Sequence, residues 1–166
     1  KSIVFVGNND DGQQGHYSSN PSASLLQENN IERLSIIPTL KSIVFVACGN
    51  SYSMCIDNTG SLWAFGANDK GQLGLKNRAS VFEPKQVQGL PPIISVACSS
   101  NHTACIDSTN SVWTFGSNQY EKLGLGVSGV VGLGPHKVPS DEMIQKVALG
   151  DTFSAFLNFN GKLMVC

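Results

Sequence analysis

One glycine-rich segment has the spacing of a cofactor-binding loop. Residues 124–129, GLGVSG, satisfy the pattern G-x-G-x-x-G, in which the glycines let the backbone approach a dinucleotide's pyrophosphate. That chemistry needs a strand before the segment and a helix after it. The residues that follow Gly129, VVGLG, have no helical periodicity, and no G-K-S/T follows any glycine cluster. We therefore predict neither a dinucleotide site nor any other cofactor.

Side chains suited to acid–base, nucleophilic or metal chemistry are few and scattered. His102 adjoins Thr103, a hydroxyl that a base could activate, but no third residue to orient the histidine is evident. His16 and His136 are isolated, so a metal ion would lack its set of ligands. The acidic residues of the connecting segments include no paired general acid and base: Glu28, Glu32, Glu83, Asp141 and Glu142. The sequence thus indicates no catalytic site, and we do not expect an enzyme.

Cysteine usage and charge restrict the compartment and the partner. The chain has 5 cysteines without a C-x-x-C pair, which predicts free, buried thiols in a reducing cytoplasmic or nuclear compartment; a disulfide is the alternative. The net charge is −1 and 14% of residues are charged, which argues against nucleic acid or an anionic membrane as a partner. Apolar runs are short, so no transmembrane helix is expected. The glycosylation sequon at Asn101 would matter only in a secreted protein.

The elements that position these residues come from an internal repeat. One block aligns in three copies on its glycines and asparagines: SIVFVGNNDDGQQGH from Ser2, SLWAFGANDKGQLGL from Ser61 and SVWTFGSNQYEKLGL from Ser111. A second block also occurs three times: VACGNSYSMCIDNTG, VACSSNHTACIDSTN and VALGDTFSAFLNFNG. The hexapeptide KSIVFV occurs at 1–6 and 41–46, but its copies fall in different blocks. The period is therefore about fifty residues rather than forty.

The repeat divides the chain without leaving a linker or a second domain. We predict one propeller segment over residues 1–166, with periods 1–59, 60–109 and 110–160. Residues 161–166 restart the strand that opens the chain. Because the chain begins with Lys and stops inside the apolar run LMVC, we expect it to be part of a longer protein.

The composition of each period predicts strands. Short runs rich in β-branched and aromatic residues end at Gly, Asn and Asp clusters, and DNTG and NFNG mark hairpin turns. A further apolar position, Ile37, Val87 or Val138, marks a fourth strand in each period. The exception is Ser22–Leu34, where we expect a short helix or an ordered loop. Four strands per unit predict an all-β fold, a partial β-propeller of about three four-stranded blades.

Equivalent positions in the repeat also predict which side chains pack between blades. Tyr52, His102 and Phe153 share one position, which favours packing over catalysis for His102. The aromatic residues of the third strand should be mostly buried: Trp63, Phe65, Trp113 and Phe115. Cysteines recur at two positions that we expect to be small buried sites: Cys48 with Cys98, and Cys55 with Cys105.

The pattern resembles the repeats of the regulator of chromosome condensation family. The residues that carry the resemblance are Val96, Ala97, Cys98, His102, Thr103, Val112, Phe115, Gly116, Asn118, Leu123 and Gly124, with Gly49, Gly60, Gly66, Asn68, Gly71, Gln72, Leu73 and Gly74. Tyr52 and Phe153 stand where the family has His, Ser99 replaces a Gly, and YEKLG replaces GQLG. The resemblance implies a propeller that usually has seven blades, of which this chain supplies about three.

Function is expected in the loops that depart from the repeat, since a propeller holds its loops on a rigid frame. The candidate partner-binding residues are Gln119, Tyr120, Glu121, Asp69, Lys70, Glu28 and Glu32. Tyr120 is the expected anchor, because aromatic residues dominate interface energies. We predict a protein–protein interaction module, a scaffold or regulatory part of a larger protein. The alternative, implied by the resemblance, is guanine-nucleotide exchange on a Ran-like or other small GTPase. The remaining blades would come from the parent chain or from a second copy.

Overall fold

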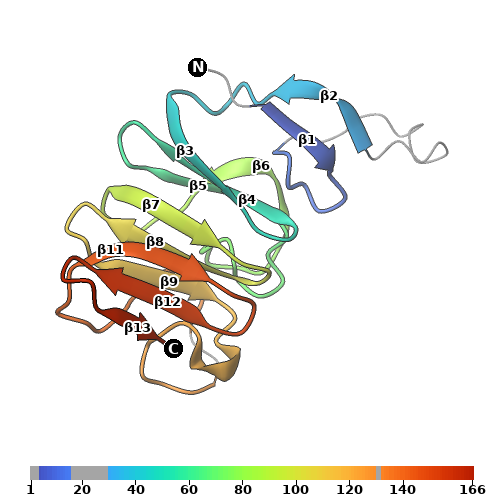
Figure 1. Cartoon of the computed structure of the whole chain (residues 1–166). Helices are drawn as coiled ribbons and strands as arrows, with labels where there is room; N and C mark the ends of the chain where they lie inside the picture. The colour runs from blue at the N-terminus through green and yellow to red at the C-terminus, as the bar shows by residue number, and fades with distance from the viewer. Residues whose placement is uncertain (1–3, 16–29, 130–131) are drawn as a thin grey trace.

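The computed structural model describes residues 4–15, 30–129 and 132–166, which form four antiparallel β-sheets arranged side by side (Figure 1). The N-terminal sheet contains two strands: β1 (Val4–Asn8) and β2 (Asn30–Ile36). Blade I contains four: β3 (Ile43–Cys48), β4 (Tyr52–Asp57), β5 (Leu62–Gly66) and β6 (Val81–Gln86).

The two following sheets repeat this order. Blade II contains β7 (Ile93–Cys98), β8 (His102–Asp107), β9 (Val112–Gly116) and β10 (His136–Lys137), with a short 3-10 turn, η2 (Gln119–Glu121), after β9. Blade III contains β11 (Ile144–Leu149), β12 (Ser154–Asn158) and β13 (Leu163–Val165). Each blade begins with its innermost strand and proceeds outward, so the chain is a partial β-propeller, as the sequence predicts.

In blades I and II, one aspartate holds the hairpin between the second and third strands. In blade II, Asp107 Oδ1 accepts hydrogen bonds from the backbone N–H groups of Thr109 and Ser111 at 2.8 and 3.0 Å. Its Oδ2 accepts the indole N–H of Trp113 at 2.8 Å. Asp57 makes the same three bonds in blade I. Asp, Thr and Ser are favoured in turns because their side chains bind nearby backbone groups in this way.

The third-strand aromatic residues enter the core as expected. Phe65 and Phe115 are 0% exposed, and Phe115 belongs to an apolar cluster that joins blades I and II. Trp63 and Trp113 are half-buried, because each indole lies where its N–H can reach the hairpin aspartate. Burial on this scale supplies most of the free energy that holds adjacent blades together.

A hydroxyl at one equivalent position of the repeat, near the start of each second strand, ties its blade to the preceding turn. Ser53, Thr103 and Ser154 donate to the carbonyl oxygens of Gln13, Gln72 and Lys122, at 2.7, 2.8 and 2.6 Å. The residue before each hydroxyl reaches forward in blades I and II. The Tyr52 hydroxyl lies 2.9 Å from Thr103 Oγ1, and His102 Nε2 lies 2.9 Å from Ser154 Oγ. The packing role predicted for this position is thus confirmed in both blades.

Two sequence predictions are wrong in part. Within Ser22–Leu34, residues 22–29 lie outside the described residues, but Asn30–Leu34 belongs to strand β2 instead of a helix, because Asn30 and Ile31 pair with Asn8 and Gly7 of β1. Cys48 is exposed, although its equivalent Cys98 is half-buried.

The exposure of Cys48 follows from its place on β3. Its neighbours Val44, Phe45 and Val46 are also exposed, so the described residues give β3 little cover. Cys98 is more buried because its strand, β7, packs against β3 and β4. All five cysteines are free thiols. Within the described parts of the chain, no helix has the length and apolar character needed to cross a membrane.

Candidate functional site

An asparagine organises the turn that follows the third strand in every copy of the repeat. Asn68 Oδ1 accepts the N–H of Leu73 at 3.0 Å, and its amide donates to the carbonyl of Asn77 at 2.9 Å. Asn118 makes equivalent bonds with Leu123 and Val127, at 3.2 and 2.9 Å. One side chain therefore fixes both the turn and the segment that crosses over it.

In blade I a glutamine and a glycine complete this turn. Gln72 accepts the N–H of Lys70 at 2.9 Å and donates to Asp69 at 3.2 Å. Gly71 has a φ of 80°, in the left-handed region where glycine has no Cβ penalty. Gln13 braces the N-terminal sheet in the same manner, through the N–H of Asp11 at 3.0 Å.

The blade II turn replaces these residues with Tyr120, Glu121 and Lys122. Tyr120 and Glu121 have φ values of 64° and 60°, so two consecutive residues with side chains occupy the left-handed region. Each such residue costs about 1–2 kcal/mol. Tyr120 is also 67% exposed. The turn therefore holds an exposed aromatic side chain on a strained backbone.

Lys122 anchors this strained turn to blade III. Its side chain is buried, and its ammonium donates to Asn101 Oδ1 at 2.7 Å and to the carbonyl of Asp151 at 2.8 Å. Burial lowers the pKa of Lys122, while the nearby Asp151 acts in the opposite direction. Lys122 thus bonds to blade III, whereas its equivalent in blade I, Gln72, bonds within its own turn.

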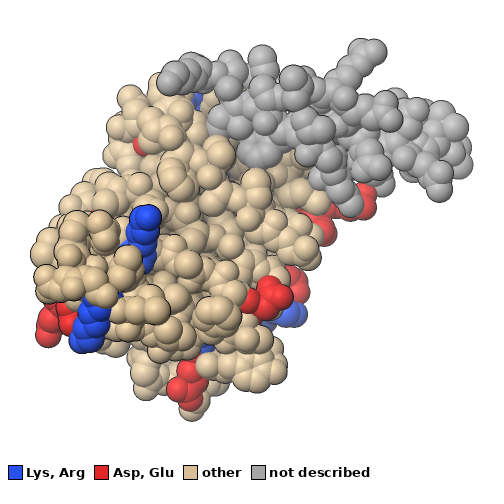
Figure 2. Space-filling view, viewed as in Figure 1, with Lys and Arg blue, Asp and Glu red and all other residues tan. Residues whose placement is uncertain are grey.

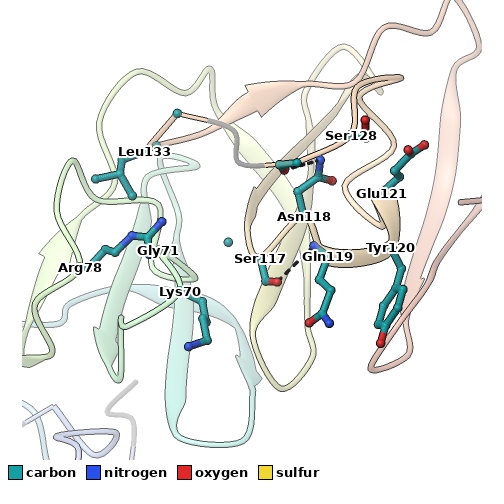
Figure 3. Close-up of a pocket in the computed structure, with 14 residues that line it drawn as sticks. Lys70, Gly71, Arg78, Ser117, Asn118, Gln119, Tyr120, Glu121, Ser128 and Leu133 are labelled. Carbon is teal, nitrogen blue, oxygen red and sulfur yellow. Dashed lines mark hydrogen bonds between the residues drawn. The ribbon is translucent and has the colours of Figure 1, made fainter.

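A cavity of about 520 Å³ separates the blade I turn from the blade II turn. Lys70, Gly71 and Arg78 line it from blade I, and residues 116–121 line it from blade II. Figure 3 shows Lys70 and Arg78 on one side of the cavity and Gln119, Tyr120 and Glu121 on the other. Lys70, Gln119 and Tyr120 extend in the same direction in this view.

Four of the residues singled out in the sequence meet at this cavity: Lys70, Gln119, Tyr120 and Glu121. Asp69 lies beside them and pairs with Lys70 at 2.8 Å. Glu28 lies outside the described residues. Glu32 belongs to β2 in the N-terminal sheet.

Sequence reasoning missed Arg78 and Ser128, which also line the cavity. They occupy equivalent places, because each follows the residue whose carbonyl accepts the amide of Asn68 or Asn118. The equal spacing from the two asparagines is a signal that could have found them. The segment 124–129 with the G-x-G-x-x-G pattern has no helix among the described residues that follow it.

His102 is part of the packing between blades II and III. It is 0% exposed, and its two ring nitrogens bond to the hydroxyls of Ser99 and Ser154. Because Ser154 donates its proton to the carbonyl of Lys122, His102 Nε2 is the donor in their shared bond. Burial lowers the pKa of His102 to about 4, and the charge of Lys122 adds to this effect.

The fold and the repeated turns define a segment of a β-propeller built from fifty-residue repeats. The family model described as "Regulator of chromosome condensation (RCC1) repeat" matches residues 59–106 and 109–157, and a second model of that description matches 43–72 and 93–121. The chain therefore belongs to the RCC1 repeat family.

Two curated relatives are much longer than the segment that they share with this chain. Protein RCC2 of Mus musculus is 36% identical over 84 residues, which are 49% of this chain and 14% of the relative. E3 ubiquitin-protein ligase HERC2 of Homo sapiens is 31% identical over 90 residues, 53% of this chain and 2% of the relative. The chain thus spans a small part of the curated relatives that it matches.

Solved structures agree on the fold. Human WBSCR16 superposes with a TM-score of 0.87 at 21% identity, covering 99% of this chain and 42% of that one. Prp20p of Saccharomyces cerevisiae gives a TM-score of 0.79 at 20% identity, covering 99% and 40%. These likenesses support the propeller architecture over the whole length of the chain.

Proposed function

We propose that this chain is a protein–protein interaction module, part of a larger intracellular scaffold or regulator, which binds its partner through the turns around the blade I–blade II cavity. The observation that carries the proposal is the strained turn at Tyr120 and Glu121. A left-handed backbone at two residues with side chains lowers stability, and such strain is concentrated at functional sites. Lys122 bonds to Asn101 and Asp151, so the backbone next to Tyr120 is anchored to its surroundings.

The surface supports a protein partner. Figure 2 shows a face with few charged side chains, on which Lys and Arg do not gather into one basic patch. Nucleic acid binding depends on such a patch. An exposed tyrosine beside a mixed polar cavity is instead typical of a protein interface, where tyrosine is enriched.

Site-specific photo-cross-linking tests the proposal. A photoreactive phenylalanine analogue is placed at position 120 in one variant and at position 108 in another. Ser108 is exposed on the β8–β9 hairpin, at the opposite end of the strands from the blade II turn. Cross-linking in cells should give a discrete protein adduct from position 120 and none from 108. The same adducts from both positions, or no adduct from position 120, would contradict the proposal.

The second candidate function is guanine-nucleotide exchange on a small GTPase. The observation that favours it is the likeness to Prp20p, whose structure is described together with its binding properties to Gsp1p and histones. Release of a fluorescent guanine nucleotide from a panel of small GTPases, with and without this chain, tests it. Faster release from one GTPase supports exchange, and unchanged rates across the panel reject it.

A further inference from the structure

The walls of the blade I–blade II cavity carry opposite charges. Lys70 and Arg78 line the blade I wall, and Glu121 lines the blade II wall. Lys70 is already engaged, because its ammonium lies 2.8 Å from Asp69. The Arg78 guanidinium forms no ion pair with any residue that the structure describes. Arg78 is therefore the cation of this wall that is available to a ligand.

The backbone at Arg78 is held in place, and its side chain is exposed. The preceding residue, Asn77, receives the Asn68 amide on its carbonyl at 2.9 Å, and its own side chain accepts the N–H of Ala79 at 3.1 Å. Asn68 is 0% exposed and also binds the blade I turn through Leu73. Asn68 therefore holds both the backbone next to Arg78 and the blade I turn.

The cavity has the shape and lining for a peptide. Glycines line several of its edges, and a Cβ placed on Gly129 would meet no atom of the described residues within 4 Å, which leaves room for a second backbone to approach. A volume of about 520 Å³ accommodates a few side chains. The exposed ring of Tyr120 offers an apolar surface at the rim.

We propose that this cavity binds a short acidic segment of a partner protein, with an Asp or Glu carboxylate paired to Arg78 and a neighbouring apolar side chain packed on Tyr120. The guanidinium fork matches a carboxylate through two parallel hydrogen bonds, which makes arginine specific for planar anions. Glu121 on the opposite wall disfavours a second acidic residue there, and this orients the bound segment. The proposal rests on the proposed interaction function and specifies the chemistry of the partner.

Peptide titration tests the acidic segment directly. The probes are a fluorescein-labelled octapeptide, Gly-Ser-Glu-Asp-Leu-Glu-Gly-Ser, and its neutral counterpart with Gln and Asn in place of Glu and Asp. Fluorescence anisotropy should show binding of the acidic peptide and at least tenfold weaker binding of the neutral one. Raising the salt concentration from about 0.05 to 0.5 M should weaken the acidic complex, because the contact is exposed.

Matched variants locate the contact. Arg78→Ala should weaken binding of the acidic peptide about tenfold, as expected for loss of a charge-assisted pair. Lys85→Ala makes the same change of charge on β6 of the same blade, outside the cavity, and should leave binding unchanged. Circular dichroism and thermal unfolding confirm that each variant is folded; Arg78→Lys provides a milder change if the alanine variant unfolds, and should retain part of the affinity.

Three results would overturn the proposal: equal binding of both peptides, equal effects of Arg78→Ala and Lys85→Ala, or binding of a serine-phosphorylated peptide but not of the acidic one. The last would identify phosphate as the recognised group. If a partner is captured from position 120 but the acidic peptide does not bind, the acidic segment is rejected and the proposed interaction function is retained. Failure of the cross-link would reject the interaction function itself.

Discussion

Tyr120 and Glu121 are the residues where this chain departs most from its own repeat. At the equivalent place in blade I, Gly71 adopts a φ of 80° and Lys70 is not left-handed. The sequence shows this departure as Tyr-Glu-Lys in place of Lys70, Gly71 and Gln72. Its backbone consequence is not visible in the sequence, because the conformation depends on Lys122 leaving the turn to bind Asn101 and Asp151.

Replacing Glu121 with glycine should relieve this strain. We expect Glu121→Gly to raise the free energy of unfolding by about 0.5–1 kcal/mol, the left-handed penalty less the extra entropy of glycine in the unfolded chain. Gly71→Ala, the reverse change in blade I, should lower it by about 1 kcal/mol or more. Urea denaturation of both variants measures the effect. A loss of stability in Glu121→Gly would show that the glutamate side chain supports the turn.

The pKa of His102 predicts how stability depends on pH. Its folded value of about 4 lies below the ordinary value of 6.5, so the unfolded chain binds the proton more tightly. The contribution of neutral His102 is complete above about pH 6.5 and is lost as the pH falls toward 4. By linkage the loss reaches about 3 kcal/mol.

Urea denaturation between pH 7 and 4 measures this loss, with His102→Gln as the comparison. The variant should show a smaller decrease across this window. The hairpin carboxylates affect stability at lower pH. Burial raises the pKa of Asp107, but hydrogen bonds from Thr109 and Trp113 lower it by more, so the pKa lies below its usual range. Identical pH profiles for the wild type and the variant would contradict the account of His102.

At the scale of elements, the sequence predicts strands well wherever the repeat is strong. Ile37 and Val87, which mark the predicted fourth strands, lie directly after β2 and β6. Both side chains are buried. Local propensity does not predict the strand at NIERL, because its pairing with β1 is a long-range contact. The division of the chain at residues 59, 109 and 160 stays a prediction.

The hairpin aspartates should contribute strongly to blade stability. Asp107 is 2% exposed and binds two backbone N–H groups, a hydroxyl and an indole. We expect Asp107→Ala to cost about 2–3 kcal/mol, since it leaves several partly buried donors without an acceptor.

Blade III offers a natural control for this prediction. Asn158 stands in place of the aspartate and accepts N–H bonds from Asn160 and Lys162 at 2.9 and 2.8 Å. Asp107→Asn should therefore be milder than Asp107→Ala, because an amide oxygen keeps the two backbone bonds. Chemical denaturation of the two variants decides, and equal losses would show that the backbone bonds contribute little.

In the whole molecule, the exposure of equivalent residues identifies two blade faces that the described strands leave largely uncovered. Val46 on β3 is 49% exposed, while its equivalent Val96, packed against blade I, is 4% exposed. Phe153 is 49% exposed, while Tyr52 and His102 at the same position are 1% and 0% exposed. Such differences could not be read from the sequence, because they depend on which blades stand next to each other.

These faces predict self-association of the 166-residue chain. Exposed apolar faces of a repeat stack are stabilised when further blades or a second copy bury them. Sedimentation velocity should show mass that increases with protein concentration, and Phe153→Ser should reduce this increase. A monomer of 17.7 kDa at every concentration, with cooperative unfolding, would show that three blades suffice.

The affinity of the partner captured from position 120 shows whether the strained turn of blade II holds that partner. Truncation of a central aromatic anchor costs about 2 kcal/mol or more, which corresponds to roughly thirtyfold in affinity. Tyr120→Ala should therefore weaken binding of the purified partner at least tenfold, and Ser108→Ala, on the opposite end of the strands, should leave it unchanged. Equal affinity of the wild type and Tyr120→Ala would show that this turn does not hold the partner.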